Sequence, residues 1–151
     1  MTTAKKPLKE IMRQARELAL NLLFQADVTK ISIKDAANTA TEHAKVSTES
    51  LDIGIELALG AWEYAWQADR LVTKLAPDWP TDRQPSVDRN ILRLAFYEMD
   101  RKGTPAAVVI DEAIELAKIY STLESSKFIN GVLAGAQRHR ATPPDSGNHK
   151  E

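Results

Sequence analysis

Apolar residues recur at intervals of three and four positions along almost the whole chain, which is the period of an amphipathic α-helix. Strict alternation of apolar and polar residues, which would favour a β-strand, never persists long enough to predict a sheet. Hydrophobic residues make up 43% of the 151 residues, enough for a globular chain with a buried core. The sequence therefore predicts an all-α protein of about seven helices, arranged as two helical bundles that share a core.

Prolines, glycines and hydroxyl residues mark where the helices are expected to begin and end. The expected helices begin at about residues 7, 32, 49, 86, 105 and 125. The third stretch is expected to reach residue 76, and its internal Gly60 predicts a kink, a close helix crossing or a break. Ser32, Ser86 and either Ser47 or Thr48 are expected to cap helices. Among the residues expected to face the core are Leu8, Met12, Trp62, Trp66 and Val108.

Three prolines, at positions 77, 80 and 85, punctuate a connector between two helical regions. The residues after 140 are polar and include two further prolines, a composition typical of disorder. The sequence thus predicts four parts: an N-terminal helical subdomain with a basic first helix over 1–76, the connector over 77–85, a C-terminal helical subdomain over 86–140, and a disordered tail over 141–151.

Several classes of protein are excluded by what the sequence lacks. It contains no cysteine, which excludes a disulfide scaffold and thiol catalysis and fits a reducing cytoplasm. Its glycines and histidines match no phosphate-binding loop and no metal-binding helix motif. Asp111, Glu112 and Glu115, followed by Lys118, are typical of a solvated helix face rather than a catalytic pair. No apolar run is long enough to span a membrane. We therefore expect a cytoplasmic binding protein, not an enzyme, with no metal and no cofactor.

Charge is unevenly distributed along a chain whose formal net charge is only -1. Residues 1–16 carry five bases and one acid, whereas residues 35–69 carry seven acids and one base. A basic arm on a near-neutral protein favours one face that binds a polyanion, although an ordinary solvated terminus would have the same composition. Projected on a helical wheel, the first helix places Lys9, Arg13 and Arg16 on one flank of its apolar stripe.

Phe24 falls on that same flank, beside the bases. Cations that neutralise phosphates and a ring that stacks on a base are what a single-stranded nucleic acid requires. The alternative is that Phe24 packs against a neighbouring helix. Residues 124–131 offer a second candidate, because a helix start, a lysine, an aromatic ring and an amide lie close together there. Phe128, Asn130 and Gly131 could equally serve packing alone.

Four segments carry a resemblance to a known family. Met12–Asp27 resembles the opening helix of the NusB family of bacterial transcription antitermination factors, and Val87–Met99 is similar to its central helix. Val109–Lys118 and Ser126–Leu133 are similar to its two most characteristic segments. The resemblance covers nearly all of residues 8–138. It implies an all-α fold of two helical bundles.

The resemblance also implies a function, a set of partners and a set of contacts. It implies an RNA-binding factor that recognises boxA-type single-stranded RNA of ribosomal RNA operons and supports processive transcription of ribosomal RNA. The implied protein partners are a small-subunit ribosomal protein acting as NusE and the transcription elongation complex. The resemblance and the basic flank together imply a set of RNA-binding residues: Lys9, Arg13, Arg16, Phe24, Asp88, Glu124, Lys127 and Phe128. An acid in such a site can accept a hydrogen bond from a base amino group.

The sequence departs from the family pattern at two places. Met12 and Gln14 interrupt the arginine cluster of the opening helix, and Ser126 stands where the family commonly has histidine. The second candidate function is a helical protein-interaction module that does not bind RNA. The two functions differ at the basic flank. If that flank binds phosphates, Arg13→Ala and Arg16→Ala are each expected to flatten the dependence of RNA affinity on salt.

Overall fold

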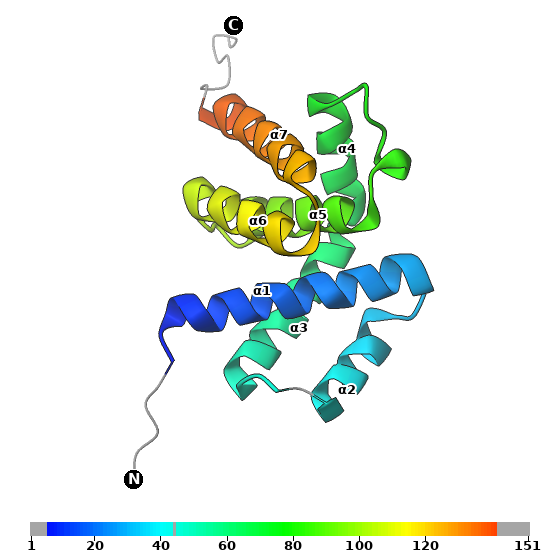
Figure 1. Cartoon of the computed structure of the whole chain (residues 1–151), viewed down its shortest axis with the longest axis vertical. Helices are drawn as coiled ribbons and strands as arrows, with labels where there is room; N and C mark the ends of the chain where they lie inside the picture. The colour runs from blue at the N-terminus through cyan, green and yellow to red at the C-terminus, as the bar shows by residue number, and fades with distance from the viewer. Residues whose placement is uncertain (1–5, 44, 142–151) are drawn as a thin grey trace, which may run out of the picture.

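The computed structural model describes residues 6–43 and 45–141, with Ala141 as backbone only (Figure 1). Apart from Ala141, which ends the last helix, the expected disordered tail lies outside the described residues. Seven α-helices and no strand occur in the described ranges, which confirms the all-α prediction. The helices are α1 (Leu8–Phe24), α2 (Ile33–His43), α3 (Thr48–Glu63), α4 (Ala65–Leu75), α5 (Ser86–Arg101), α6 (Ala106–Tyr120) and α7 (Leu123–Ala141).

Two groups of helices meet along α1 and α5. α1 runs across the molecule, with α2 on one side of it and α5, α6 and α7 on the other, while α3 crosses behind α1 from the side of α2 toward α5 (Figure 1). α1 packs chiefly on α3, and both helices also contact α5. α4 packs on α5 and α7, so residues 65–75 lie against the second group of helices. The division of the chain at the proline-rich connector stays a prediction.

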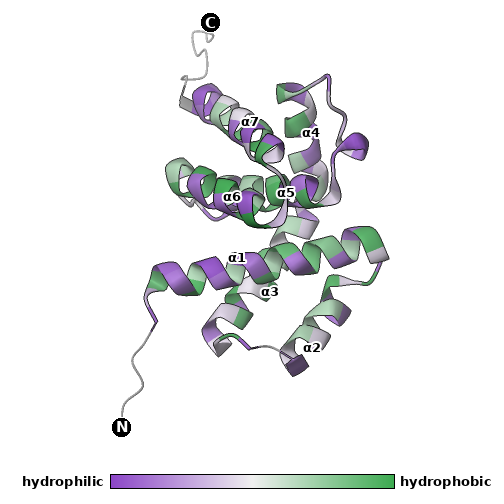
Figure 2. Cartoon of the chain, in the orientation of Figure 1, coloured by the Kyte–Doolittle hydropathy of each residue, from purple (hydrophilic) through white to green (hydrophobic). Residues whose placement is uncertain are grey.

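α5 is the central helix of the fold. Its buried residues lie on every side of the helix, as expected for an element covered by neighbours all round. They are Asp88, Asn90, Ile91, Leu92, Arg93, Leu94, Ala95, Phe96 and Glu98. The outer helices are amphipathic instead, and hydrophobic and hydrophilic residues alternate along their ribbons (Figure 2). The charged residues buried on α5 therefore need partners inside the protein.

The structure confirms that the helix expected over residues 49–76 is interrupted near Gly60, and it shows why a glycine is needed there. α3 ends at Glu63 and α4 begins at Ala65, with Tyr64 as the only residue between them. A Cβ atom built on Gly60 would collide with the ring of Tyr97 on α5. Glycine at this position therefore lets α3 cross closely over α5 just before the chain turns into α4.

Five of the six expected helix starts agree with the structure to within one residue, whereas α7 begins at Leu123, two residues before its expected start. The Ser32 hydroxyl oxygen accepts the backbone N–H of Asp35 at 3.0 Å, and that of Ser47 accepts the N–H of Ser50 at 3.1 Å. Ser86, by contrast, is the first residue of α5 and follows Pro85 at the N-cap position, so its expected capping role is wrong. Gly103, with φ of 70°, follows the end of α5. No described helix has the length and apolar character needed to cross a membrane.

Four of the expected core positions are wrong. Trp66 is 66% exposed, and Trp62, Val108 and Leu8 are also exposed. The break at Tyr64 explains Trp66, because the apolar stripe of α3 does not continue in phase into α4. Trp62 lies within α3 itself, beside the buried Ala58 and Ala61. Ala61, Ala68 and Val72 are buried there instead. The guanidinium of Arg70 lies over the Trp66 ring at 4.7 Å from its centroid.

Candidate functional site

The basic flank of α1 lies against α6 and forms one wall of a cleft. We call this cleft the α1–α6 seam, and its volume is about 790 Å³. Its lining residues come only from these two helices: Leu8, Lys9, Met12, Arg13, Arg16, Val108, Asp111, Glu112, Ile114, Glu115 and Lys118. The sequence-predicted bases of the first helix are therefore brought together along one surface feature. The acidic residues of α6 face them across it.

Arg16 differs from its two basic neighbours because its side chain is buried. Its guanidinium donates two hydrogen bonds to the Glu98 carboxylate of α5, at 2.8 and 2.9 Å. Glu112 of α6 lies 3.9 Å from the same guanidinium. The side chains of Arg16 and Glu98 are only 7% and 3% exposed. Arg16 thus joins three helices, and its expected contact with RNA gains no support from this geometry.

Arg13 and Lys9 remain on the surface of the seam. Arg13 donates two hydrogen bonds to Glu112, at 3.2 and 3.1 Å, and this carboxylate raises the already high pKa of Arg13. Glu112 is itself buried, so it is not the solvated residue that the sequence predicted. Lys9 is exposed and has no ion pair among the described residues. Lys118 pairs with Glu115 at 3.7 Å on the solvent side of α6, as its spacing predicted.

Phe24 lies in a smaller groove beyond the other end of the seam. This groove, which we call the aromatic slot, has a volume of about 190 Å³. Its lining residues come from α1, α5 and α6: Glu17, Leu20, Asn21, Phe24, Val87 and Tyr120. Phe24 is half-buried, so it is neither a fully packed core residue nor a free ring. Tyr120, the last residue of α6, is 48% exposed and was not among the residues singled out from the sequence.

Asp88 lies underneath the turn between α6 and α7. It is fully buried, and its two carboxylate oxygens accept hydrogen bonds from the hydroxyl groups of Ser121 at 2.7 Å and Ser125 at 2.5 Å. The start of α5 therefore holds the turn that ends α6 and begins α7. The expected RNA contact of Asp88 stays a prediction, and the geometry favours a positioning role.

The remaining expected contacts lie in the first turns of α7. Glu124 and Lys127 are exposed. Phe128 is half-buried, and its ring meets the edge of Trp79 from the connector, with 4.0 Å between ring centroids. Asn130 and Gly131 are exposed, so neither serves as a buried packing residue. No group of three or more His, Asp or Glu side chains in the described ranges is placed to hold a metal ion.

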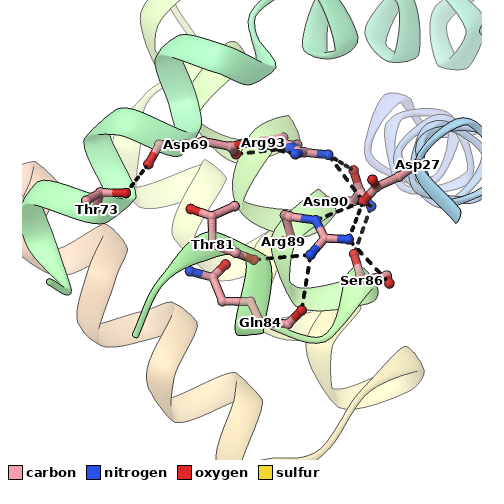
Figure 3. A network of polar contacts seen from close by, with 9 residues as sticks. All are labelled: Asp27, Asp69, Thr73, Thr81, Gln84, Ser86, Arg89, Asn90 and Arg93. Atoms are coloured by element: carbon pink, nitrogen blue, oxygen red, sulfur yellow. Dashed lines mark hydrogen bonds and ion pairs between the residues drawn. The ribbon is translucent and has the colours of Figure 1, made fainter. Parts of the chain in front are cut away.

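A network of ion pairs, which sequence analysis also missed, fixes the end of α1 to α5 (Figure 3). The carboxylate of Asp27, in the π-helical turn after α1, accepts hydrogen bonds from Arg89 at 2.8 Å and Asn90 at 3.0 Å. It also lies 3.3 Å from the guanidinium of Arg93, which binds Asp69 of α4 at 2.8 Å. Burial acts to raise the pKa of Asp27, but these donors and charges outweigh it and lower the pKa.

Comparison with known proteins gives a consistent result. The NusB family model matches residues 13–138. The transcription antitermination protein NusB of Solibacter usitatus is 44% identical over 87% of this chain and 91% of its own length. That of Streptomyces griseus subsp. griseus is 42% identical over 80% of this chain and 87% of its own length.

Solved structures resemble this fold over most of the chain. The crystal structure of Thermotoga maritima NusB matches with a TM-score of 0.77 and 28% identity, and the match covers 97% of this chain and 99% of that one. A structure of the antitermination factors NusB and NusE in complex with double-stranded RNA matches with a TM-score of 0.78 and 22% identity. That match covers 87% of this chain and 99% of that one, and it shows likeness of fold.

Proposed function

This chain belongs to the NusB family, and we propose that it acts as an RNA-binding transcription antitermination factor. In this proposal it binds boxA-type RNA of ribosomal RNA operons, together with a small-subunit ribosomal protein in the role of NusE. It would then work in the cytoplasm within the transcription elongation complex. Its curated relatives are named for transcription antitermination, in agreement with the sequence prediction of a protein that is not an enzyme.

One observation carries the proposal beyond family membership. The α1–α6 seam and the aromatic slot follow each other along α1, so bases and aromatic rings share one edge of the molecule. Lys9 and Arg13 supply positive charge at one end, and Phe24 and Tyr120 supply rings at the other. Single-stranded nucleic acids are bound by this combination, because cations neutralise phosphates while rings stack on bases.

The second candidate function, a protein-interaction module without RNA binding, is favoured by a different observation. Arg16 forms an ion pair with Glu98, and Arg13 is partly neutralised by its ion pair with Glu112. Fewer cations are therefore available to bind phosphates than the sequence predicted. Filter binding of a boxA-type RNA, with and without the NusE-like ribosomal protein, separates the two functions. Absence of RNA affinity in both conditions would exclude the RNA-binding function.

Salt dependence tests which bases contact phosphates. For a single strand, each neutralised phosphate contributes about -0.7 to the slope of log K against log salt concentration. We expect Lys9→Ala and Arg13→Ala each to flatten this slope, because both side chains reach the surface of the seam. Lys74→Ala, an exposed lysine of α4 outside the seam, is the matched control and should leave the slope unchanged. Equal slopes in all four proteins would show that the seam does not bind phosphates.

Phe24→Ala tests the ring at the other end of the seam. Loss of one stacked base should weaken RNA binding by about 1–3 kcal/mol. Because Phe24 is only half-buried, the variant should lose less stability than the roughly 3–5 kcal/mol of a fully buried phenylalanine. Thermal melts and RNA titrations measure the two effects separately. A large fall in melting temperature with unchanged RNA affinity of the folded variant would identify Phe24 as a packing residue only.

A further inference from the structure

A groove lies between the last turns of α4 and α7, two helices that pack on α5 and diverge toward their C-terminal ends (Figure 1). We call it the α4–α7 groove, and its volume is about 370 Å³. The buried side chains of Phe96 and Ala136 form its floor, and the half-buried Leu71 and Leu75 form one wall. The groove shares no lining residue with the α1–α6 seam or the aromatic slot, so it is separate from the proposed RNA contacts.

Basic side chains alone surround the opening of this groove. Lys74, His139 and Arg140 line it, and no acidic residue does. Lys74 and His139 are exposed, and neither has an ion pair among the residues that the structure describes. Apolar walls below a basic opening are complementary to a ligand whose apolar body ends in an anion.

Arg140 is already fixed in position at the edge of the groove. Its guanidinium donates a hydrogen bond to Asp100 at 2.5 Å and lies 5.5 Å from the centroid of the Phe96 ring. Asp100 also accepts the hydroxyl of Tyr64 at 2.6 Å. Because a guanidinium has several N–H donors, the contact with Asp100 leaves others for a bound anion. An anion that binds here therefore loses less free energy to the ordering of a flexible side chain.

The volume of the groove limits the size of its ligand. At the roughly 30 Å³ that one water molecule occupies, the groove holds about twelve non-hydrogen atoms. This is too small for a nucleic-acid strand, but it lies within the range of pockets that bind small molecules, about 300–1,000 Å³. A carboxylate with a chain of about ten carbons has the required size and the required distribution of charge.

We propose that the α4–α7 groove binds such a free medium-chain carboxylate. The chain lies over Phe96 and Ala136 and against the two leucines of α4, where it is removed from water. The carboxylate lies at the opening and accepts hydrogen bonds from Lys74, His139 and Arg140. This ligand site is a second binding function and does not depend on the RNA-binding function proposed above.

Decanoate is the probe for the charged opening, and isothermal titration calorimetry below its micelle concentration measures its affinity. We expect one bound decanoate per chain and a melting temperature that rises with decanoate concentration. Lys74→Gln should weaken binding about tenfold, because one charged hydrogen bond is lost. Lys34→Gln removes an exposed lysine from α2, which does not line the groove, and should bind as the wild type does. 1-Decanol, which has the same chain without the charge, should bind at least about tenfold more weakly than decanoate.

Ala136→Leu tests the cavity itself. The larger side chain fills the floor of the groove, so the variant should not bind decanoate, while its melting temperature should be equal to or above that of the wild type. If this variant does not fold, Lys74→Gln decides, because an exposed lysine can be replaced without loss of packing.

Three results would overturn the proposal: equal affinities for decanoate and 1-decanol, equal affinities of Lys74→Gln and Lys34→Gln for decanoate, or unchanged binding by a folded Ala136→Leu. Association with phosphatidylglycerol vesicles without binding of monomeric decanoate would also overturn it, since the bases would then contact a membrane surface. RNA affinity should be the same in all these proteins. Failure of the groove therefore leaves the proposed function intact, and failure of RNA binding leaves the groove intact.

Discussion

Replacing Arg16 by alanine should destabilise the protein by about 3–5 kcal/mol, the effect of removing one partner from a buried ion pair. The substitution leaves the carboxylate of Glu98 buried without its two guanidinium donors. Chemical denaturation of wild type and variant measures the change in the free energy of unfolding. RNA affinity of the folded fraction should keep the salt slope of the wild type, because the buried guanidinium reaches no phosphate.

Two comparisons separate this effect from a loss of positive charge. Arg13→Ala removes a partly exposed cation of the same helix, while Arg16 stays beside Glu112, so it should lower the melting temperature much less than Arg16→Ala does. Arg16→Met combined with Glu98→Leu removes both buried charges and should be more stable than Arg16→Met alone. An Arg16→Ala protein of wild-type stability with a flattened salt slope would restore Arg16 as an RNA contact.

Replacing Asp27 by asparagine should cost about 3 kcal/mol at neutral pH, near the lower end of the range for a broken buried ion pair. The carboxylate is the shared partner of Arg89, Asn90 and Arg93, and its side chain is only 13% exposed. An amide keeps the shape but loses the charge that holds the two guanidinium groups. Urea denaturation at pH 7 measures the loss.

The same substitution has a predictable dependence on pH. The pKa of Asp27 is lower in the folded protein than in the unfolded chain, where it is about 3.9. Its stabilising contribution is therefore complete above about pH 4 and is lost as the pH falls through the folded-state value. The difference in stability between wild type and Asp27→Asn should be constant from pH 7 to about 5 and should shrink at lower pH. A difference that grows on acidification would contradict the assignment.

The helices could be predicted from the sequence because their signals are local. Apolar spacing and the capping hydroxyls of Ser32 and Ser47 act within a few residues, and the structure agrees with both. The exposure of Trp66 could not be predicted, because a helical wheel assumes one continuous helix. One residue, Tyr64, interrupts α3 and α4 and so changes which side chains face the core.

The candidate site was predictable in its location but not in the role of each residue. The basic flank and Phe24 lie along one edge of the molecule, as the wheel of the first helix indicated. Arg16, however, is bound by Glu98, 82 residues further along the chain, and no periodicity within a helix reveals such a partner. Asp88 is likewise bound by serines more than thirty residues away.

The buried carboxylate of Asp88 has a consequence for the entropy of binding. Ser121 follows Tyr120 directly, and Ser125 precedes Lys127 by two residues, so both hydrogen bonds of Asp88 fix backbone next to a proposed contact. Tyr120 at the end of α6 and Lys127 at the start of α7 are therefore both attached to a turn whose backbone is held in place by Asp88. The freedom that their backbones would otherwise lose on meeting a ligand is already lost when the protein folds.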